Sequence, residues 1–192
     1  IEFSDGCFAI SEAMQREYRS IFNKKINILI NPISFEKKIK LNYLLPTKKI
    51  IFLYAGGLTL GRLDALLKLF NFLSKTCLDK GISPIFDLCS GDSISKQQNI
   101  ILRKLNINFL GKLNKEDVEN KISNADFLIH VEGSEFYIKE KTKFSISTKI
   151  PECLSSGKPL IAYGPDDIAS MKLIYENELG LFLNSQDTDQ DI

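Results

Sequence analysis

Two stretches of the sequence carry residues that suit the binding of an anion. In the first, "YAGGLTLGRL", Gly56, Gly57 and Leu58 follow a hydrophobic run, and Arg62 comes shortly after them. Glycines after a buried strand let backbone N–H groups approach an anion, and the positive end of the next helix points at it. The guanidinium of Arg62 is planar, always charged and suited to phosphate oxygens. The alternative is a tight strand–helix turn with a solvated arginine, and these residues alone leave both open.

The glycine spacing excludes two familiar nucleotide loops. Gly56 and Gly61 have the Gly-x4-Gly spacing of a P-loop, but Arg62 and Leu63 stand where that motif needs Lys and Ser/Thr. A leucine cannot hold Mg²⁺, so hydrolysis of a nucleoside triphosphate is disfavoured. Residues 56–61 also do not fit the Gly-x-Gly-x-x-Gly dinucleotide pattern. We therefore expect no protein-bound metal and no tightly bound cofactor.

The second stretch is "SISTKIPECLSSGKP". Pro151 fits only the first turn of a helix, which therefore begins near residues 147–149. Lys149 then lies at the positive end of the helix, which costs about 0.3–1 kcal/mol unless an anion binds there. Ser147 and Thr148 are either caps or ligands of that anion. Glu152 is well placed with or without a ligand.

Repeated strand–helix units position these two stretches. Buried hydrophobic runs predict strands at 49–57, 83–91, 107–113, 126–133, 159–165 and 181–184. Helical patterns fill the gaps from residue 63 and at 92–105, 114–125 and 166–180, whereas 134–146 looks irregular. The class is α/β, a Rossmann-like, doubly wound parallel sheet. Both stretches then lie at the carboxyl edge of the sheet and define a crevice for a diphosphate.

Residues 1–47 do not follow this rhythm. They predict a strand end, a turn and an amphipathic helix capped by Ser11, then a strand in "KINILINPI" and a loop over 34–49. The chain begins at Ile1, and a polar tail follows its last apolar run. We expect a fragment in which residues 1–47 bridge from an upstream domain and residues 48–192 form a second domain that is truncated at its C-terminus.

Bulk composition excludes several classes of function. Net charge is +1, from 25 basic and 24 acidic residues, so no overall field recruits nucleic acid. The four cysteines form no CxxC pair, and His130 is the single histidine, so neither a zinc site nor a Cys/His nucleophile is expected. Scattered cysteines and the lack of a signal peptide or a ~20-residue apolar span favour the cytoplasm.

Residues 48–185 resemble the C-terminal, donor-binding domain of GT-B fold glycosyltransferases of the retaining family 4. The stretches that carry the resemblance are "YAGGLTLGR", "ISNADFLIHVE", "STKIPECLSSGKPLIAYGP" and "IYENELGLFL", in that order. The opening "FAISEAMQREY…NILINPI" resembles the end of the N-terminal domain and the interdomain crossing. No single motif is specific, but the ordered set covers nearly the whole chain.

The resemblance implies a nucleotide-diphosphate sugar as donor. Gly57, Leu58 and Arg62 would approach its diphosphate, and Glu152 would bind the ribose. Arg62 and Lys149 would stabilise the leaving diphosphate, with no protein nucleophile. The remaining implied contacts are Ser147 and Thr148 to the diphosphate and the backbone of Gly111, Lys112 and Leu113 to the base.

One departure from the family concerns the sugar. Many relatives have a Glu-x7-Glu pair whose second member matches Glu152, but the first position here is Phe144. Glu132 or His130 could substitute, although His130 also suits a half-buried strand position. The "HVE…FSISTKIPE" variant is similar to enzymes that build bacterial surface polysaccharides. A glycan or lipid-linked acceptor would bind the upstream domain, and the full-length protein would work at the inner face of the plasma membrane.

Two alternatives remain. A sugar-nucleotide epimerase shares the GT-B architecture, but it uses extra carboxylates and histidines near the sugar, and this chain offers few. A non-catalytic nucleotide-sugar-binding or scaffold module is the second. A scaffold would not need cations at two helix starts, and a receiver-like domain would need clustered acids after its first strand.

Overall fold

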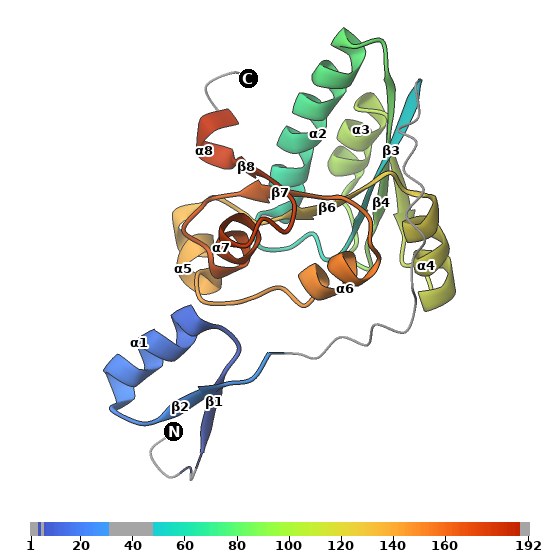
Figure 1. Cartoon of the computed structure of the whole chain (residues 1–192). Coiled ribbons are helices and arrows are strands. Elements are labelled where there is room, and N and C mark those ends of the chain that lie inside the picture. Colours follow the sequence, from blue (N-terminus) through green and yellow to red (C-terminus); the bar gives the residue numbers. More distant parts are fainter. Residues whose placement is uncertain (1–3, 5, 31–47, 189–192) are drawn as a thin grey trace.

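The computed structural model describes residues 4, 6–30 and 48–188. Its centre is one six-stranded sheet in the order β5-β4-β3-β6-β7-β8, in which every neighbouring pair is parallel (Figure 1). This confirms the predicted α/β class and all six predicted strands. The strands are β3 (Lys49–Ala55), β4 (Ser83–Cys89), β5 (Ile107–Gly111), β6 (Phe127–Val131), β7 (Leu160–Gly164) and β8 (Leu181–Asn184).

Helices cover both faces of the sheet because its strands are buried on both sides. In β3, Phe52 and Tyr54 point to one face and Leu53 points to the other, as the alternation of a strand requires. The first face packs against α2 (Arg62–Asp79) and α3 (Lys96–Lys104). The second face packs against α4 (Lys115–Asn124), α6 (Lys149–Ser155) and α7 (Ala169–Glu176).

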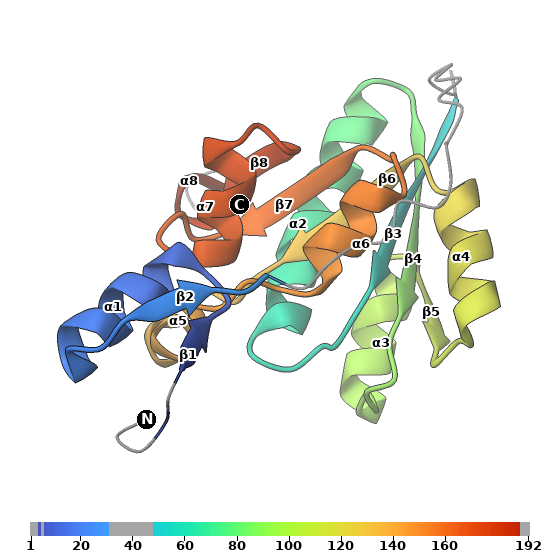
Figure 2. The ribbon, with the colours of Figure 1, turned by 60° about the horizontal axis from the view of Figure 1, so that its bottom comes forward.

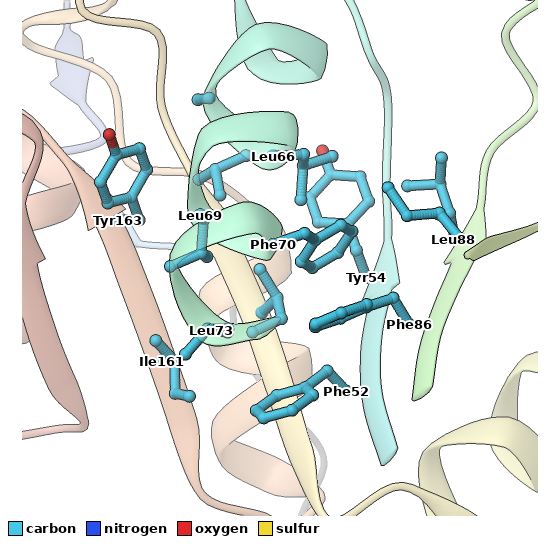
Figure 3. Packing of buried hydrophobic residues seen from close by; sticks show 14 of the residues in the cluster. Phe52, Tyr54, Leu66, Leu69, Phe70, Leu73, Phe86, Leu88, Ile161 and Tyr163 are labelled. Carbon is cyan, nitrogen blue, oxygen red and sulfur yellow. The ribbon is translucent and has the colours of Figure 1, made fainter. Parts of the chain in front are cut away.

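Stacked aromatic rings hold α2 on the first face. The ring of Phe70 in α2 lies 4.5 Å, centroid to centroid, from that of Phe86, and Phe86 lies 5.3 Å from Phe52. Figure 3 shows these rings between the helix and the strands, with Leu66 and Leu69 beside them. Stacked pairs of this kind add about 0.5–1.5 kcal/mol beyond their buried area. This packing fixes the start of α2, where Arg62 lies.

The strand order creates one switch point. From β3 the chain adds β4 and β5 on one side, and then β6, β7 and β8 on the other. β3 and β6 are therefore neighbours, with Phe52 opposite Phe127. The loops that follow them lead to opposite sides, and in open α/β sheets ligands bind in the crevice that this leaves at the carboxyl ends. Arg62 follows β3 and Glu132 follows β6.

Residues 6–30 form a separate β–α–β unit. β1 (Cys7–Ala9) pairs in parallel with β2 (Ile26–Ile28), and α1 (Glu12–Phe22) connects them. The predicted cap is confirmed, because Ser11 Oγ accepts a hydrogen bond from the N–H of Met14 at 3.0 Å. The same hydroxyl donates to the carbonyl of Phe144 at 2.6 Å. The unit thus lies on the side where the strands of the large sheet end (Figures 1 and 2).

One prediction of local structure was wrong, and the start of one predicted helix was misplaced. Residues 134–146 contain a helix, α5 (Phe136–Thr142), whose buried stripe is only Ile138 and Thr142. Two buried positions among lysines are too few to predict a helix from periodicity. The helix predicted at 92–105 begins at Lys96, because Ser95 forms a capping box with Gln98.

The remaining differences lie near the ends of elements. The helix predicted at 166–180 is the shorter α7, and α8 (Ser185–Thr188) was not predicted. The strand predicted at 25–33 is the three-residue β2. Residues 31–33 and residues 34–47 of the predicted loop lie outside the described residues. Within the described part of the chain, no helix has the length and hydropathy that crossing a bilayer requires.

Candidate functional site

The turn before Arg62 is tightly constrained. Leu60 and Gly61 both adopt left-handed backbone conformations, with φ of 57° and 71°. Glycine accepts this freely, whereas the leucine is strained by about 1–2 kcal/mol. A Cβ on Gly133, just after β6, would collide with the Leu60 carbonyl oxygen. The two loops of the switch point are therefore in direct backbone contact, and Arg62 is the first residue of α2 after this turn.

Arg62 and Glu132 form an ion pair across the switch point. Arg62 Nη2 lies 3.0 Å from Glu132 Oε2, and the two side chains are 21% and 3% exposed. The backbone N–H of Glu132 donates to the carbonyl of Tyr163 at 3.0 Å, which ties Glu132 to β7. Sequence reasoning placed both residues at the donor but did not predict that they bind each other. Glu132 is buried behind Arg62.

Glu132 stays ionised despite its burial. Burial raises the pKa of its carboxyl group, but the attraction of His130 and Arg62 outweighs burial and lowers the pKa below its ordinary value. His130 Nε2 lies 3.5 Å from Glu132 Oε1 and, among the described residues, makes no hydrogen bond. His130 is buried, 3% exposed, rather than half-buried as one alternative predicted. The side chains of His130 and Glu132 are thus almost completely shielded from solvent.

The glycine loop already uses several of its polar groups. The N–H of Leu58 donates to Asp92 Oδ2 at 2.6 Å, and the N–H of Gly56 donates to the carbonyl of Cys89 at 3.0 Å. An anion that binds the Leu58 amide must therefore displace a carboxylate. Sequence reasoning missed Asp92, although it directly follows the second predicted strand, at the carboxyl edge where ligands bind.

Tyr54 explains part of the glycine pattern. Its hydroxyl donates to the carbonyl of Gly57 at 2.5 Å, and a Cβ on Gly56 would lie 2.9 Å from the hydroxyl oxygen. Burial raises the pKa of Tyr54 well above its ordinary value, so the hydroxyl remains a donor. A side chain at position 56 would therefore disturb the Tyr54 hydroxyl, so Gly56 serves internal packing whether or not an anion binds.

The second predicted stretch forms the start of α6, as Pro151 predicted. Lys149 is the first residue of the helix, and its Nζ lies 2.8 Å from Glu152 Oε2, with the side chains 46% and 61% exposed. Exposed pairs of this kind are worth about 0–1 kcal/mol, so a ligand can displace either partner at little cost. Ser147 Oγ accepts from the N–H of Lys149 at 3.3 Å, whereas Thr148 makes no side-chain capping bond.

Gly111, Lys112 and Leu113 lie farther along the same edge. Gly111 ends β5, two strands away from β3, and has a φ of 67°. Its carbonyl accepts from the N–H of Ser90 at 3.0 Å. The structure therefore places the three predicted regions along one edge, with Arg62 at the switch point. In the part of the chain that the structure describes, no three His, Cys, Asp or Glu side chains are grouped to hold a metal ion.

The fold is that of the Rossmann-like domains of GT-B proteins. No protein-family model matches the chain, and no curated protein sequence matches it. Among solved structures, the glycosyltransferase TarM aligns with a TM-score of 0.66 and 14% identity over 96% of this chain. The N-terminal domain of Candida albicans trehalose-6-phosphate phosphatase aligns with a TM-score of 0.67 and 12% identity, again over 96%.

A third structure contains ligands. A variant of S. aureus TarM in complex with Fondaparinux, alpha-GlcNAc-glycerol and UDP aligns with a TM-score of 0.64 and 15% identity over 96% of this chain. At these identities the similarity establishes the fold alone. The chain spans 34% of TarM and 48% of the Candida albicans structure.

Proposed function

We propose that this chain is the donor-binding portion of a retaining glycosyltransferase of the family 4 type. The observation that carries the proposal is the position of Arg62, whose half-buried guanidinium lies at the switch point of a GT-B-like sheet. The TarM complex with UDP and a sugar–glycerol compound supports a nucleotide-diphosphate sugar as donor and a glycan or lipid-linked acceptor. The pathway we propose is bacterial cell-surface polysaccharide biosynthesis.

Arg62 and Lys149 would act as the catalytic residues in this proposal. As the bond to the sugar breaks, negative charge grows on the leaving diphosphate, and fixed cations stabilise that charge. The two groups begin different helices, Arg62 at the start of α2 and Lys149 at the start of α6. The rest of the rate enhancement would come from orienting donor and acceptor.

Other residues would bind the donor without taking part in bond breaking. Glu152 would accept hydrogen bonds from the ribose hydroxyls after exchanging its contact with Lys149. The amides of Gly57 and Leu58 would approach the diphosphate, with Asp92 leaving the Leu58 N–H. Ser147 and Thr148 would add contacts to the diphosphate, and residues 111–113 would frame the base.

The acceptor would bind a second domain. We propose that residues 1–47 are the end of a preceding domain and the crossing segment, and that residues 48–192 are the donor domain. The unit of residues 6–30 lies beside the carboxyl edge, as expected of a neighbour that closes the crevice. The full protein would work in the cytoplasm, held peripherally at the inner face of the plasma membrane.

A panel of UDP, GDP, dTDP, CDP and their sugars tests the proposal. One nucleoside diphosphate should raise the melting temperature of the chain and bind measurably by calorimetry. Arg62→Ala should lose most of this binding, whereas Arg103→Ala, which removes an arginine from the end of α3, should keep it. If no nucleotide binds the wild type, the proposed function is wrong.

A second candidate is a non-catalytic nucleotide-sugar-binding module. It is favoured by the exposed position of Lys149, whose side chain is 46% exposed and pairs only with the exposed Glu152. Such a weakly held cation suits recognition of a phosphate better than stabilisation of a leaving group. Steady turnover of a donor by a protein that joins this chain to the proposed second domain would exclude this candidate.

A further inference from the structure

We infer that Glu132 is the positioning residue of this site: it holds the guanidinium of Arg62 so that its remaining N–H groups face the crevice. This inference rests on the proposed function, since it assigns the group that prepares Arg62 for a diphosphate. Guanidinium has five N–H donors, and the contact with Glu132 uses one terminal nitrogen. The others remain for a ligand that approaches the exposed part of the side chain.

The backbones of both partners are fixed. Arg62 follows the left-handed pair Leu60 and Gly61, and its own N–H donates to the carbonyl of Thr59 at 3.3 Å. Glu132 continues the pairing of β6 with β7 through its bond to Tyr163. Because Gly133 has no side chain, its backbone can lie directly against the backbone of Leu60 and Gly61. The ion pair therefore joins two rigid points, which is what a positioned catalytic group requires.

The pair differs from the other buried carboxylate pair in the described chain. Asp87 has hydrogen bonds to both oxygens, from Asn108 at 2.9 Å and from Lys121 at 2.8 Å. Glu132 has one close contact, from Arg62 to Oε2 at 3.0 Å, and its Oε1 faces the buried Nε2 of His130 at 3.5 Å. The Asp87 pair joins β4 to α4, whereas the Glu132 pair joins the two loops of the switch point. The Glu132 pair thus lies where ligands bind in open α/β sheets, and the Asp87 pair does not.

Burying the Arg62–Glu132 ion pair costs folding free energy, which suggests that the pair has a role other than stability. Moving an ion pair into a protein interior costs several kcal/mol per ion, and a well-packed apolar pair is often as stable. Here the carboxylate is fully buried while the guanidinium still reaches solvent. That asymmetry leaves the cation accessible and the anion hidden, so that a diphosphate meets only the guanidinium.

The affinity ratio of UDP to UMP measures the contact with the second phosphate. We would titrate the 192-residue chain with both nucleotides, or with the corresponding GDP, dTDP or CDP pair, in wild type, Glu132→Gln, Arg62→Ala and the double variant. Glutamine keeps the volume but loses the charge that holds Arg62. Glu132→Gln should lower the ratio about tenfold, and the double variant should equal Arg62→Ala, because Glu132 acts only through Arg62.

Asp87→Asn is the matched control, since it changes a buried, ion-paired carboxylate to an amide outside the crevice. It should lower the melting temperature without changing the ratio. An unchanged ratio in Glu132→Gln, or a further loss when that change is added to Arg62→Ala, would overturn the inference.

The nuclear magnetic resonance signal of Arg62 Nε–H decides the inference without any nucleotide. In the wild type this signal should show a restrained side chain and slow exchange with water, and in Glu132→Gln it should show motional averaging. The signal remains decisive if no nucleotide binds, an outcome that would defeat the proposed function alone. An identical Arg62 signal in both proteins would show that Glu132 does not position the guanidinium.

Discussion

Gly133 lies so close to Gly61 that a Cβ on Gly133 would be 3.1 Å from the Cα of Gly61. The same Cβ would collide with the carbonyl oxygen of Leu60. The loops after β3 and β6 therefore fit together only when residue 133 has no side chain. The two charged residues beside this contact, Arg62 and Glu132, owe their relative position to it.

Gly133→Ala should destabilise the fold and disturb the ion pair. The obstacle is backbone rather than a flexible side chain, so the loops must move apart, at a cost of about 1–3 kcal/mol. Denaturant unfolding measures this loss. Gly91→Ala is the control, because its Cβ would meet only the Lys112 side chain, at an ordinary 3.8 Å. Equal stability of the two variants would contradict the close contact.

Nucleotide binding should not need a divalent metal. The position at which a P-loop supplies its Mg²⁺ ligand is Leu63, which lies in the hydrophobic core at 6% exposure. Calorimetry with the nucleoside diphosphate that the panel selects should give the same affinity in EDTA as in Mg²⁺. Strict dependence on Mg²⁺ would show that Arg62 and Lys149 do not neutralise the diphosphate by themselves.

The stability provided by Glu132 should be lost in acid. Its folded-state pKa lies below its ordinary value of 4.5, so the contribution is fully present above pH 4.5. It disappears as the pH falls through the lower, folded-state pKa. The difference in unfolding free energy between wild type and Glu132→Gln should therefore be constant at neutral pH and shrink below pH 4.5. A difference that does not change down to pH 3 would show that the folded-state pKa is not reached there, and one that grows would contradict the direction of the shift.

Short-range chemistry made much of the fold predictable. The run at residues 49–55 is hydrophobic on both faces, so it could only be a central strand, and Ser11 and Pro151 each determine where a helix begins. The position of Arg62 at the start of α2 was also predictable, because Arg62 directly follows the glycine turn that ends the strand. The orders β3-β4-β5 and β6-β7-β8 agree with the tendency of strand–helix–strand units to connect neighbouring strands, but the return from β5 to β6, beside β3, does not follow from it.

Contacts between distant segments were not predictable in this way. Arg62 and Glu132 are 70 positions apart, and Leu58 and Asp92 are 34 apart, so no local pattern connects them. Each became visible only when the sheet brought two strand ends together. The resemblance to glycosyltransferases named most of these residues but assigned Glu132 to the sugar, and that role stays a prediction.

Lys149→Ala should weaken binding of the nucleoside diphosphate. The lost contact is charge-assisted and worth about 1.5–3 kcal/mol, or roughly ten- to a hundredfold in affinity. Lys143→Ala is the matched control, since Lys143 forms a similar exposed pair three residues from Glu140. Glu152→Gln should weaken recognition of the ribose and leave the melting temperature unchanged. Undiminished affinity in Lys149→Ala would remove this residue from the site.

The 192-residue chain should bind a sugar nucleotide weakly and transfer no sugar. In the proposed enzyme the reaction takes place between two domains, and this chain spans 34% of TarM. Its six-stranded sheet has its own core on both faces, so the donor half should fold alone. The contacts made by closure of a second domain would be absent, which weakens donor binding. Nothing would orient an acceptor hydroxyl against the anomeric carbon, and orientation supplies much of the rate.

A radiolabelled donor incubated with the chain and a panel of acceptors should yield no glycosylated product, whereas calorimetry of the same preparation should still detect the nucleotide. Sugar transfer by this chain alone would contradict the assignment of residues 48–192 as a donor domain that depends on a partner domain.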